Sequence, residues 1–168
     1  MDTPDIFINP LERYKHYEEA YLNGELDPYF ETMSVYNLRM VVNADAPNAQ
    51  LAWGRRMLRD YHPDFVWLED LGWRYNKICP SDVRYNKPQW THSPRDYMQI
   101  LSGGGLCGPR AWFARFICKA HGIPTWGIRL PGHASYSKWE PEGWYVKSSE
   151  IWLRNELYLC AISFHVCF

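Results

Sequence analysis

The chain has 168 residues, 46% of them hydrophobic and 22% charged, with a formal net charge of −1 when histidine is neutral. This length is typical of a single domain, taken as 1–168, with one core. The longest basic run is Arg55-Arg56, so there is no electrostatic footprint for nucleic acid or a membrane surface. We therefore expect no nucleic-acid partner.

The N-terminus and the cysteines bear on the compartment. The first residues are acidic and lack the order of a secretory signal, and no apolar run reaches the roughly 18 residues of a membrane span. Both observations favour a cytoplasmic location. The five cysteines form no C-x-x-C pair and are odd in number, which argues against a disulfide scaffold and a structural zinc site. We expect free thiols and no metal or cofactor, and the sequence does not indicate an oligomeric state.

Capping signals predict two helices in the N-terminal half. Asn9-Pro10 followed by apolar residues at helical spacing predicts a helix over 10–22. A second is expected over 47–60, because the residue before Pro63 is pushed out of the helical region. The segment 36–42 between them fits a helix or a strand.

The middle of the chain has weaker patterns. Residues 65–90 alternate aromatic and polar residues without a lasting period, so loops with short strands or turns are expected. Ser93 is the predicted N-cap of a short helix that ends at Ile100. Asp96 would occupy its third helical position, where an acid suits the macrodipole.

The C-terminal half predicts one helix followed by a sheet. An apolar stripe over 109–120 predicts a buried helix opened by Pro109 and closed by Gly122. His121 lies in the last turn of this helix, where a cationic side chain would interact favourably with the helix dipole. Strands over 123–130 and 132–139, and a third from Trp144, form an antiparallel meander. Helices followed by a sheet define an α+β fold.

The most informative motif surrounds Cys107. This residue follows Gly103-Gly104-Gly105 and lies next to the start of the predicted helix. The partial positive charge of a helix N-terminus stabilises a thiolate, and the glycines would let a substrate carbonyl approach the backbone. A histidine, His133, returns 26 residues later in Pro131-Gly132-His133-Ala134. Imidazole can deprotonate the thiol and later protonate a leaving amine, so the two residues predict a nucleophile and its base.

The order of these features resembles the transglutaminase-like superfamily of papain-like cysteine enzymes. The resemblance rests on Gly105-Leu106-Cys107-Gly108, a helix, Gly122-Ile123-Pro124, a strand and Gly132-His133-Ala134, and covers about residues 103–147. It implies a papain-like arrangement in which a helix headed by the cysteine packs on an antiparallel sheet. Residues 1–102 form a helical, loop-rich N-terminal part without a motif of their own, and 148–168 an atypical apolar tail.

The resemblance also implies roles for individual residues. Cys107 is the nucleophile, and His133 is the general base and acid. The Cys107 backbone N–H and a side-chain donor, Trp90 or Gln89, would form the oxyanion hole.

A third triad member, Asp or Asn, is expected where this chain has Lys147-Ser148. Ser148 or Glu150 is a possible substitute. The tail after Lys147 does not resemble the rest of a transglutaminase-like sheet. Either a truncated or misassembled gene product, or a lineage in which a helix closes the domain, would explain this difference.

Two functions therefore remain open. The first is cysteine-dependent acyl transfer or hydrolysis on an amide or peptide carbonyl, through a thioester, with a peptide, protein or small amide as substrate. The second is a catalytically degenerate domain of the same class that acts as a binding or scaffold module, which the lysine at position 147 favours. Redox sensing through Cys107 would need a second thiol nearby in space.

Overall fold

The computed structural model of the protein describes residues 8–90 and 96–147, and the backbone of residues 152–153. Its helices are α1 (Pro10–Leu22), the 3-10 helix η1 (Phe30–Thr32), α2 (Val35–Val42), α3 (Asn48–Tyr61), α4 (Pro63–Val66), α5 (Ile78–Asp82), α6 (Tyr97–Gly103) and α7 (Cys107–Ala120). Its strands are β1 (Thr125–Leu130), β2 (His133–Glu140), β3 (Gly143–Lys147) and β4 (Trp152–Leu153). The helices precede the strands, which confirms the α+β class.

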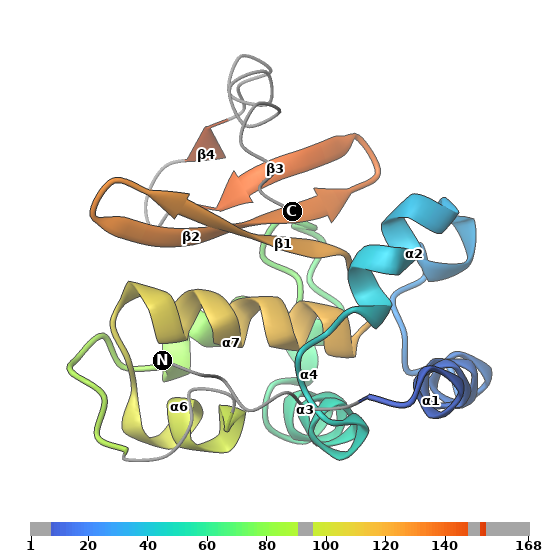
Figure 1. The fold of residues 1–168 in the computed structure, drawn as a ribbon, viewed down its shortest axis with the longest axis horizontal. Helices are drawn as coiled ribbons and strands as arrows, with labels where there is room; N and C mark the ends of the chain where they lie inside the picture. The colour runs from blue at the N-terminus through green and yellow to red at the C-terminus, as the bar shows by residue number, and fades with distance from the viewer. Residues whose placement is uncertain (1–7, 91–95, 148–151, 154–168) are drawn as a thin grey trace.

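Helix α7 lies at the centre of the fold. The sheet covers one side of it, and α3 and α6 pack on the other (Figure 1). Phe113, Phe116 and Ile117 of α7 are almost completely buried. Close packing with α3 requires Gly54, where an added Cβ would lie 2.9 Å from the Phe116 ring. The apolar stripe of the central helix therefore has partners on both sides.

The sheet is antiparallel, in the order β1-β2-β3-β4. Leu130 pairs with His133 across a tight turn at Pro131-Gly132, and Gly132 takes a φ of +71° there. Tyr136 of β2 pairs with Lys147 of β3. The predicted meander is confirmed, with β1 beginning two residues later than expected.

The lengths of α7 and β1 determine where β2 begins. A helix of 14 residues spans about 21 Å, and a strand of 6 residues spans about 20 Å. The chain reverses at Gly122, whose φ of +82° suits a glycine helix cap. Strand β1 therefore carries the chain back along α7. The β1–β2 turn lies above the N-terminal end of α7, where Cys107 is the first residue (Figure 1).

The N-terminal helices agree well with the sequence. The Asn9 side chain accepts hydrogen bonds from Leu11 and Glu12 at the start of α1, as expected for an N-cap. Helix α3 lies within one residue of its predicted range at each end. The ambiguous segment 36–42 is helical, with Ser34 as its cap.

Two details differ from the sequence predictions. Residues 65–90 form no strand, apart from a single β-bridge between Tyr85 and Gly105. They contain helix α5 and the end of α4. Asp96 is the N-cap of α6 and not the third residue of the helix. Its side chain accepts hydrogen bonds from the N–H groups of Met98 and Gln99. The predicted cap Ser93 lies outside the described residues.

A buried lysine joins the loop after α4 to the sheet. The ammonium of Lys138 donates to the carbonyls of Leu71 (2.6 Å) and Arg74 (2.8 Å) and contacts Asn76 Oδ1 at 3.3 Å. Only 1% of Lys138 is exposed. Asn76 in turn donates to the Tyr136 hydroxyl at 2.5 Å. The loop is thereby held against the inner face of β2.

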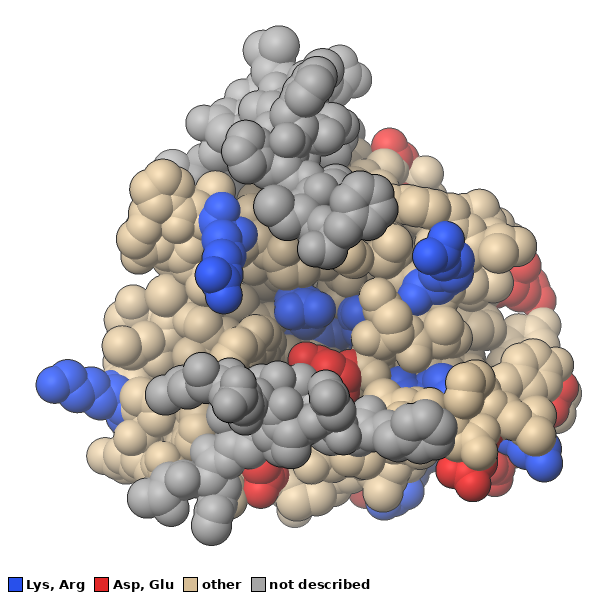
Figure 2. Space-filling model, in the orientation of Figure 1, with Lys and Arg blue, Asp and Glu red and all other residues tan. Residues whose placement is uncertain are grey.

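The surface carries no concentrated basic patch on the face shown in Figure 2, where Lys, Arg, Asp and Glu side chains are dispersed. Within the described part of the chain, no helix is long and apolar enough to cross a membrane.

Candidate functional site

Cys107 is the first residue of α7. The helix begins two residues earlier than predicted, with Leu106 as its N-cap residue and Pro109 as its third residue. Proline is tolerated at that position because the first N–H groups of a helix have no intrahelical acceptor. The thiol is half-buried, so it is accessible to a small reagent. Cys107 therefore lies at the positive end of α7.

The triple glycine before Cys107 is required by packing inside the protein. Gly104 has a φ of +73°, and a Cβ there would lie 1.9 Å from Asn86 Oδ1 and 2.7 Å from the Arg84 carbonyl oxygen. A Cβ at Gly105 would lie 2.5 Å from Pro109. Gly104 and Gly105 therefore have a packing role, and the expectation that these glycines also admit a substrate stays a prediction. Gly108 is the open position, since beyond its chain neighbours and the backbone of its own helix no described atom lies within 4 Å of its Cβ site.

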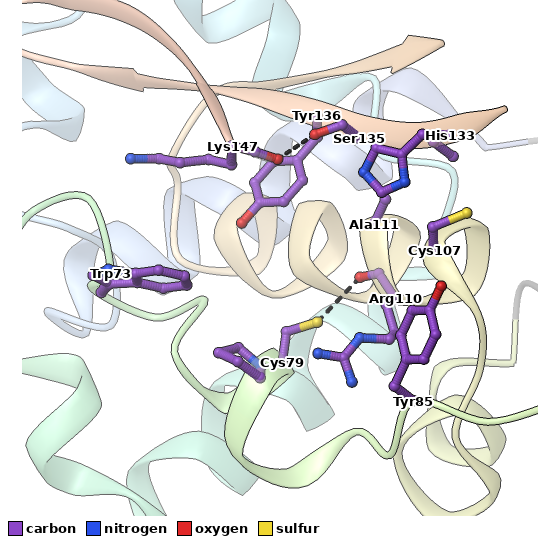
Figure 3. A pocket seen from close by; sticks show the side chains of 12 residues that line it. Trp73, Cys79, Tyr85, Cys107, Arg110, Ala111, His133, Ser135, Tyr136 and Lys147 are labelled. Carbon is purple, nitrogen blue, oxygen red and sulfur yellow. Dashed lines mark hydrogen bonds between the residues drawn. The ribbon is translucent and has the colours of Figure 1, made fainter. Parts of the chain in front are cut away.

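Cys107 and His133 line the same pocket, whose cavity volume is about 110 Å³. His133 is the first residue of β2, and its ring points from the sheet toward the end of α7 that carries Cys107 (Figure 3). Two segments separated by 26 residues thus bring together the thiol and imidazole that the sequence singled out.

The rest of the pocket is aromatic and cationic. Trp73, Tyr85 and Tyr136 supply aromatic surface, and Arg110 and Lys147 supply positive charge. Among the described residues that line this cavity, none is acidic. Trp73, from the loop held by Lys138, is a wall residue that the sequence did not indicate.

Lys147 does not direct its charge at His133. Its ammonium bonds to Glu140 Oε1 at 2.8 Å and lies 5.9 Å from the centre of the Tyr145 ring. In Figure 3 its side chain extends away from His133. Burial lowers the pKa of Lys147 to about 8, while the hydrogen bond to Glu140 opposes the shift. Any repulsion between Lys147 and an imidazolium at His133 is therefore weakened by Glu140.

The proposed third members, Ser148 and Glu150, both lie outside the described residues. Within the described ranges, no side chain forms a hydrogen bond with the His133 ring. Ser135, on the same strand, donates its hydroxyl to the Lys147 carbonyl.

The two proposed oxyanion donors are placed differently. The Trp90 indole N–H donates to the Gly104 carbonyl at 2.8 Å, and the Gln89 side chain is exposed. Neither residue lines the pocket. Trp90 therefore stabilises the glycine loop and has its donor occupied.

Two backbone donors at the start of α7 were only partly anticipated. The N–H groups of Cys107 and Gly108 have no acceptor among the described residues, and no side chain caps the helix. The absence of a Cβ at Gly108 leaves room for a ligand there. The glycine directly after Cys107 in Gly105-Leu106-Cys107-Gly108 hinted at this, but only the helix start at Cys107 makes the Gly108 N–H a first-turn donor.

The other described thiols and histidines differ from the pair. Burial raises the pKa of Cys79 to about 12 and also raises that of Cys118. His121 is 1% exposed, and burial lowers its pKa to about 3, so its predicted role as a cation is wrong. Its ring stacks on Tyr75 with centroids 4.2 Å apart. Cys160 and Cys167 lie outside the described residues.

Comparisons with known protein families, with curated proteins and with solved structures find no match to this chain. The functional argument therefore rests on the site itself.

Proposed function

We propose that the protein is a transglutaminase-like cysteine enzyme that transfers or hydrolyses acyl groups from an amide or peptide carbonyl. The observation that carries this proposal is that Cys107, at the N-terminus of α7, and His133, at the start of β2, line one pocket. A helix headed by a cysteine and packed on an antiparallel sheet that presents a histidine is also the arrangement that the sequence resemblance implies. The bonding of Lys147 to Glu140 weakens the repulsion that Lys147 would exert on a protonated His133.

The chemistry follows from the positions of these groups. The Cys107 sulfur attacks the carbonyl carbon while His133 takes the thiol proton, and a C–S bond forms. Negative charge develops on the carbonyl oxygen, and the N–H groups of Cys107 and Gly108 can stabilise it. The C–N bond then breaks, and the amine leaves with the proton held by His133.

The resulting thioester needs a second nucleophile. Water or an amine attacks the thioester carbonyl, and His133 takes the proton from this nucleophile as the C–S bond breaks. With water the protein is a hydrolase, and with an amine it is a transferase. Both outcomes use the same two side chains.

An activated ester tests the proposal without knowledge of the natural substrate. We expect p-nitrophenyl acetate to give a burst of nitrophenol and a protein 42 Da heavier, about the mass of one acetyl group in place of a hydrogen, on Cys107. Cys107→Ser and His133→Gln should abolish the burst. Cys79→Ser is the matched control, since it alters a second pocket thiol whose hydroxyl replacement can still donate to the Arg110 carbonyl.

The alternative is a binding or scaffold domain that retains the fold. It predicts no burst and no acetyl group on Cys107 in a protein whose folding is normal by circular dichroism. Acetylation spread over lysines and several thiols would likewise contradict the enzyme proposal.

A further inference from the structure

Arg110 is one of two pocket cations, with Lys147, that the proposed chemistry does not use. It lies three residues after Cys107 on α7, so both side chains project from the same face of the helix. Both line the pocket, and Figure 3 shows the guanidinium below Cys107, between the Cys79 thiol and the Tyr85 ring. The site therefore has a permanent positive charge on the nucleophile's own helix.

The surrounding protein fixes the guanidinium but does not neutralise it. Nη1 of Arg110 donates to the Val83 carbonyl, and the guanidinium carbon lies 5.5 Å from the centre of the Tyr85 ring. Among the described residues, no carboxylate is within ion-pair distance of Arg110. Lys147, the other cation in this pocket, is already bonded to Glu140. Within the described part of the chain, the charge of Arg110 is thus the pocket charge without a carboxylate partner.

A guanidinium held in this way suits a planar anion. Its fixed fork of N–H donors matches the geometry of a carboxylate, and stacking on an aromatic ring keeps it oriented. The aromatic walls at Trp73, Tyr85 and Tyr136 suit the less polar part of the same ligand. We infer that the pocket takes a carbonyl substrate that also carries a carboxylate, and that Arg110 binds this carboxylate beside the Cys107 nucleophile.

This inference names the substrate class of the proposed function and rests on it. A pair of alkylating reagents can test it without turnover. Iodoacetate and iodoacetamide both alkylate a thiolate with loss of iodide, and they differ in that only iodoacetate is anionic. The measured quantity is the ratio of their rate constants at Cys107, followed by peptide mass spectrometry at pH 8.5.

Four proteins are compared. Arg110→Gln should lower the iodoacetate-to-iodoacetamide ratio about fivefold, since it removes a partly screened charge near the reacting sulfur. Arg110→Lys keeps the charge and should keep most of the ratio. Arg59→Gln is the matched control, because it removes an equal charge from an exposed site on α3 and should leave the wild-type ratio unchanged.

The outcomes separate the two claims. An unchanged ratio in Arg110→Gln would overturn the inference. This includes the case in which both rate constants fall equally, because that result indicates a structural role. At pH 8.5 an accessible thiol reacts whether or not His133 activates it. Failure of the proposed function would therefore appear as a missing acyl burst while the charge selectivity could still be measured.

Discussion

Replacing Gly104 by alanine is expected to destabilise the loop that leads into the nucleophile. With φ at +73° and ψ at −166°, Gly104 occupies a backbone region that is essentially restricted to glycine. Forcing alanine into it costs about 1 to 3 kcal/mol. The new Cβ would also overlap Asn86 Oδ1 at 1.9 Å and the Arg84 carbonyl oxygen at 2.7 Å.

The second contact cannot relax independently. The Arg84 carbonyl accepts the Gly105 N–H at 3.0 Å, so moving the carbonyl away from a Cβ at position 104 weakens that bond, which is worth about 1 kcal/mol. We therefore expect Gly104→Ala to lower the free energy of unfolding by about 2 to 4 kcal/mol. Urea denaturation at pH 7, monitored by circular dichroism, measures this difference.

Gly108→Ala is the control, since it makes the same substitution on the other side of Cys107. Its Cβ site meets no described atom, and it lies in the first turn of α7. Alanine should leave the stability unchanged or raise it by up to about 1 kcal/mol. A Gly104→Ala variant within about 0.5 kcal/mol of wild type, or a Gly108→Ala variant as destabilised as Gly104→Ala, would refute the packing explanation of the glycine loop.

Two further predictions concern the buried ionisable side chains Lys138 and His121. Lys138→Met should lower the free energy of unfolding by about 3 kcal/mol in the same urea assay, because it leaves the Leu71 and Arg74 carbonyls without their donor; wild-type stability would contradict this. The pKa of folded His121, about 3, lies below the unfolded value of 6.5, so the unfolded chain binds the proton first as the pH falls. Protonation of His121 in the unfolded chain therefore lowers the free energy of unfolding as the pH falls from 6.5 toward about 3. His121→Phe should reduce the loss of stability between pH 7 and 4.5 by about 2 kcal/mol. Equal pH dependence of stability in variant and wild type would argue against this role.

Local signals in the sequence were sufficient for the elements that have strong caps and periodicity. Asn9 at the start of α1 and Gly122 at the end of α7 are examples, since each satisfies a backbone requirement that depends only on its neighbours. The β1–β2 hairpin followed from alternation around Pro131-Gly132. These signals were enough to place Cys107 next to a helix start and His133 on a strand.

Features set by contacts distant in sequence were not predictable. Helix α5 is too short to show a period, and the loop at residues 71–76 is held by Lys138, more than 60 residues away. Nothing in the sequence distinguished Arg110 from an ordinary helical residue, whereas the structure places it in the pocket with no acidic partner among the described residues. The start of α7 was misplaced because Pro109 is compatible with the third helical position as well as the first.

The central claim is that His133 activates the Cys107 thiol, and the pH dependence of alkylation tests it most directly. Iodoacetamide should label Cys107 in preference to the buried Cys79 and Cys118, and rapidly below pH 7, where an ordinary thiol reacts slowly. In His133→Gln the labelling of Cys107 should rise only toward pH 8.5, as for an ordinary thiol. Identical pH profiles in wild type and His133→Gln would contradict the account.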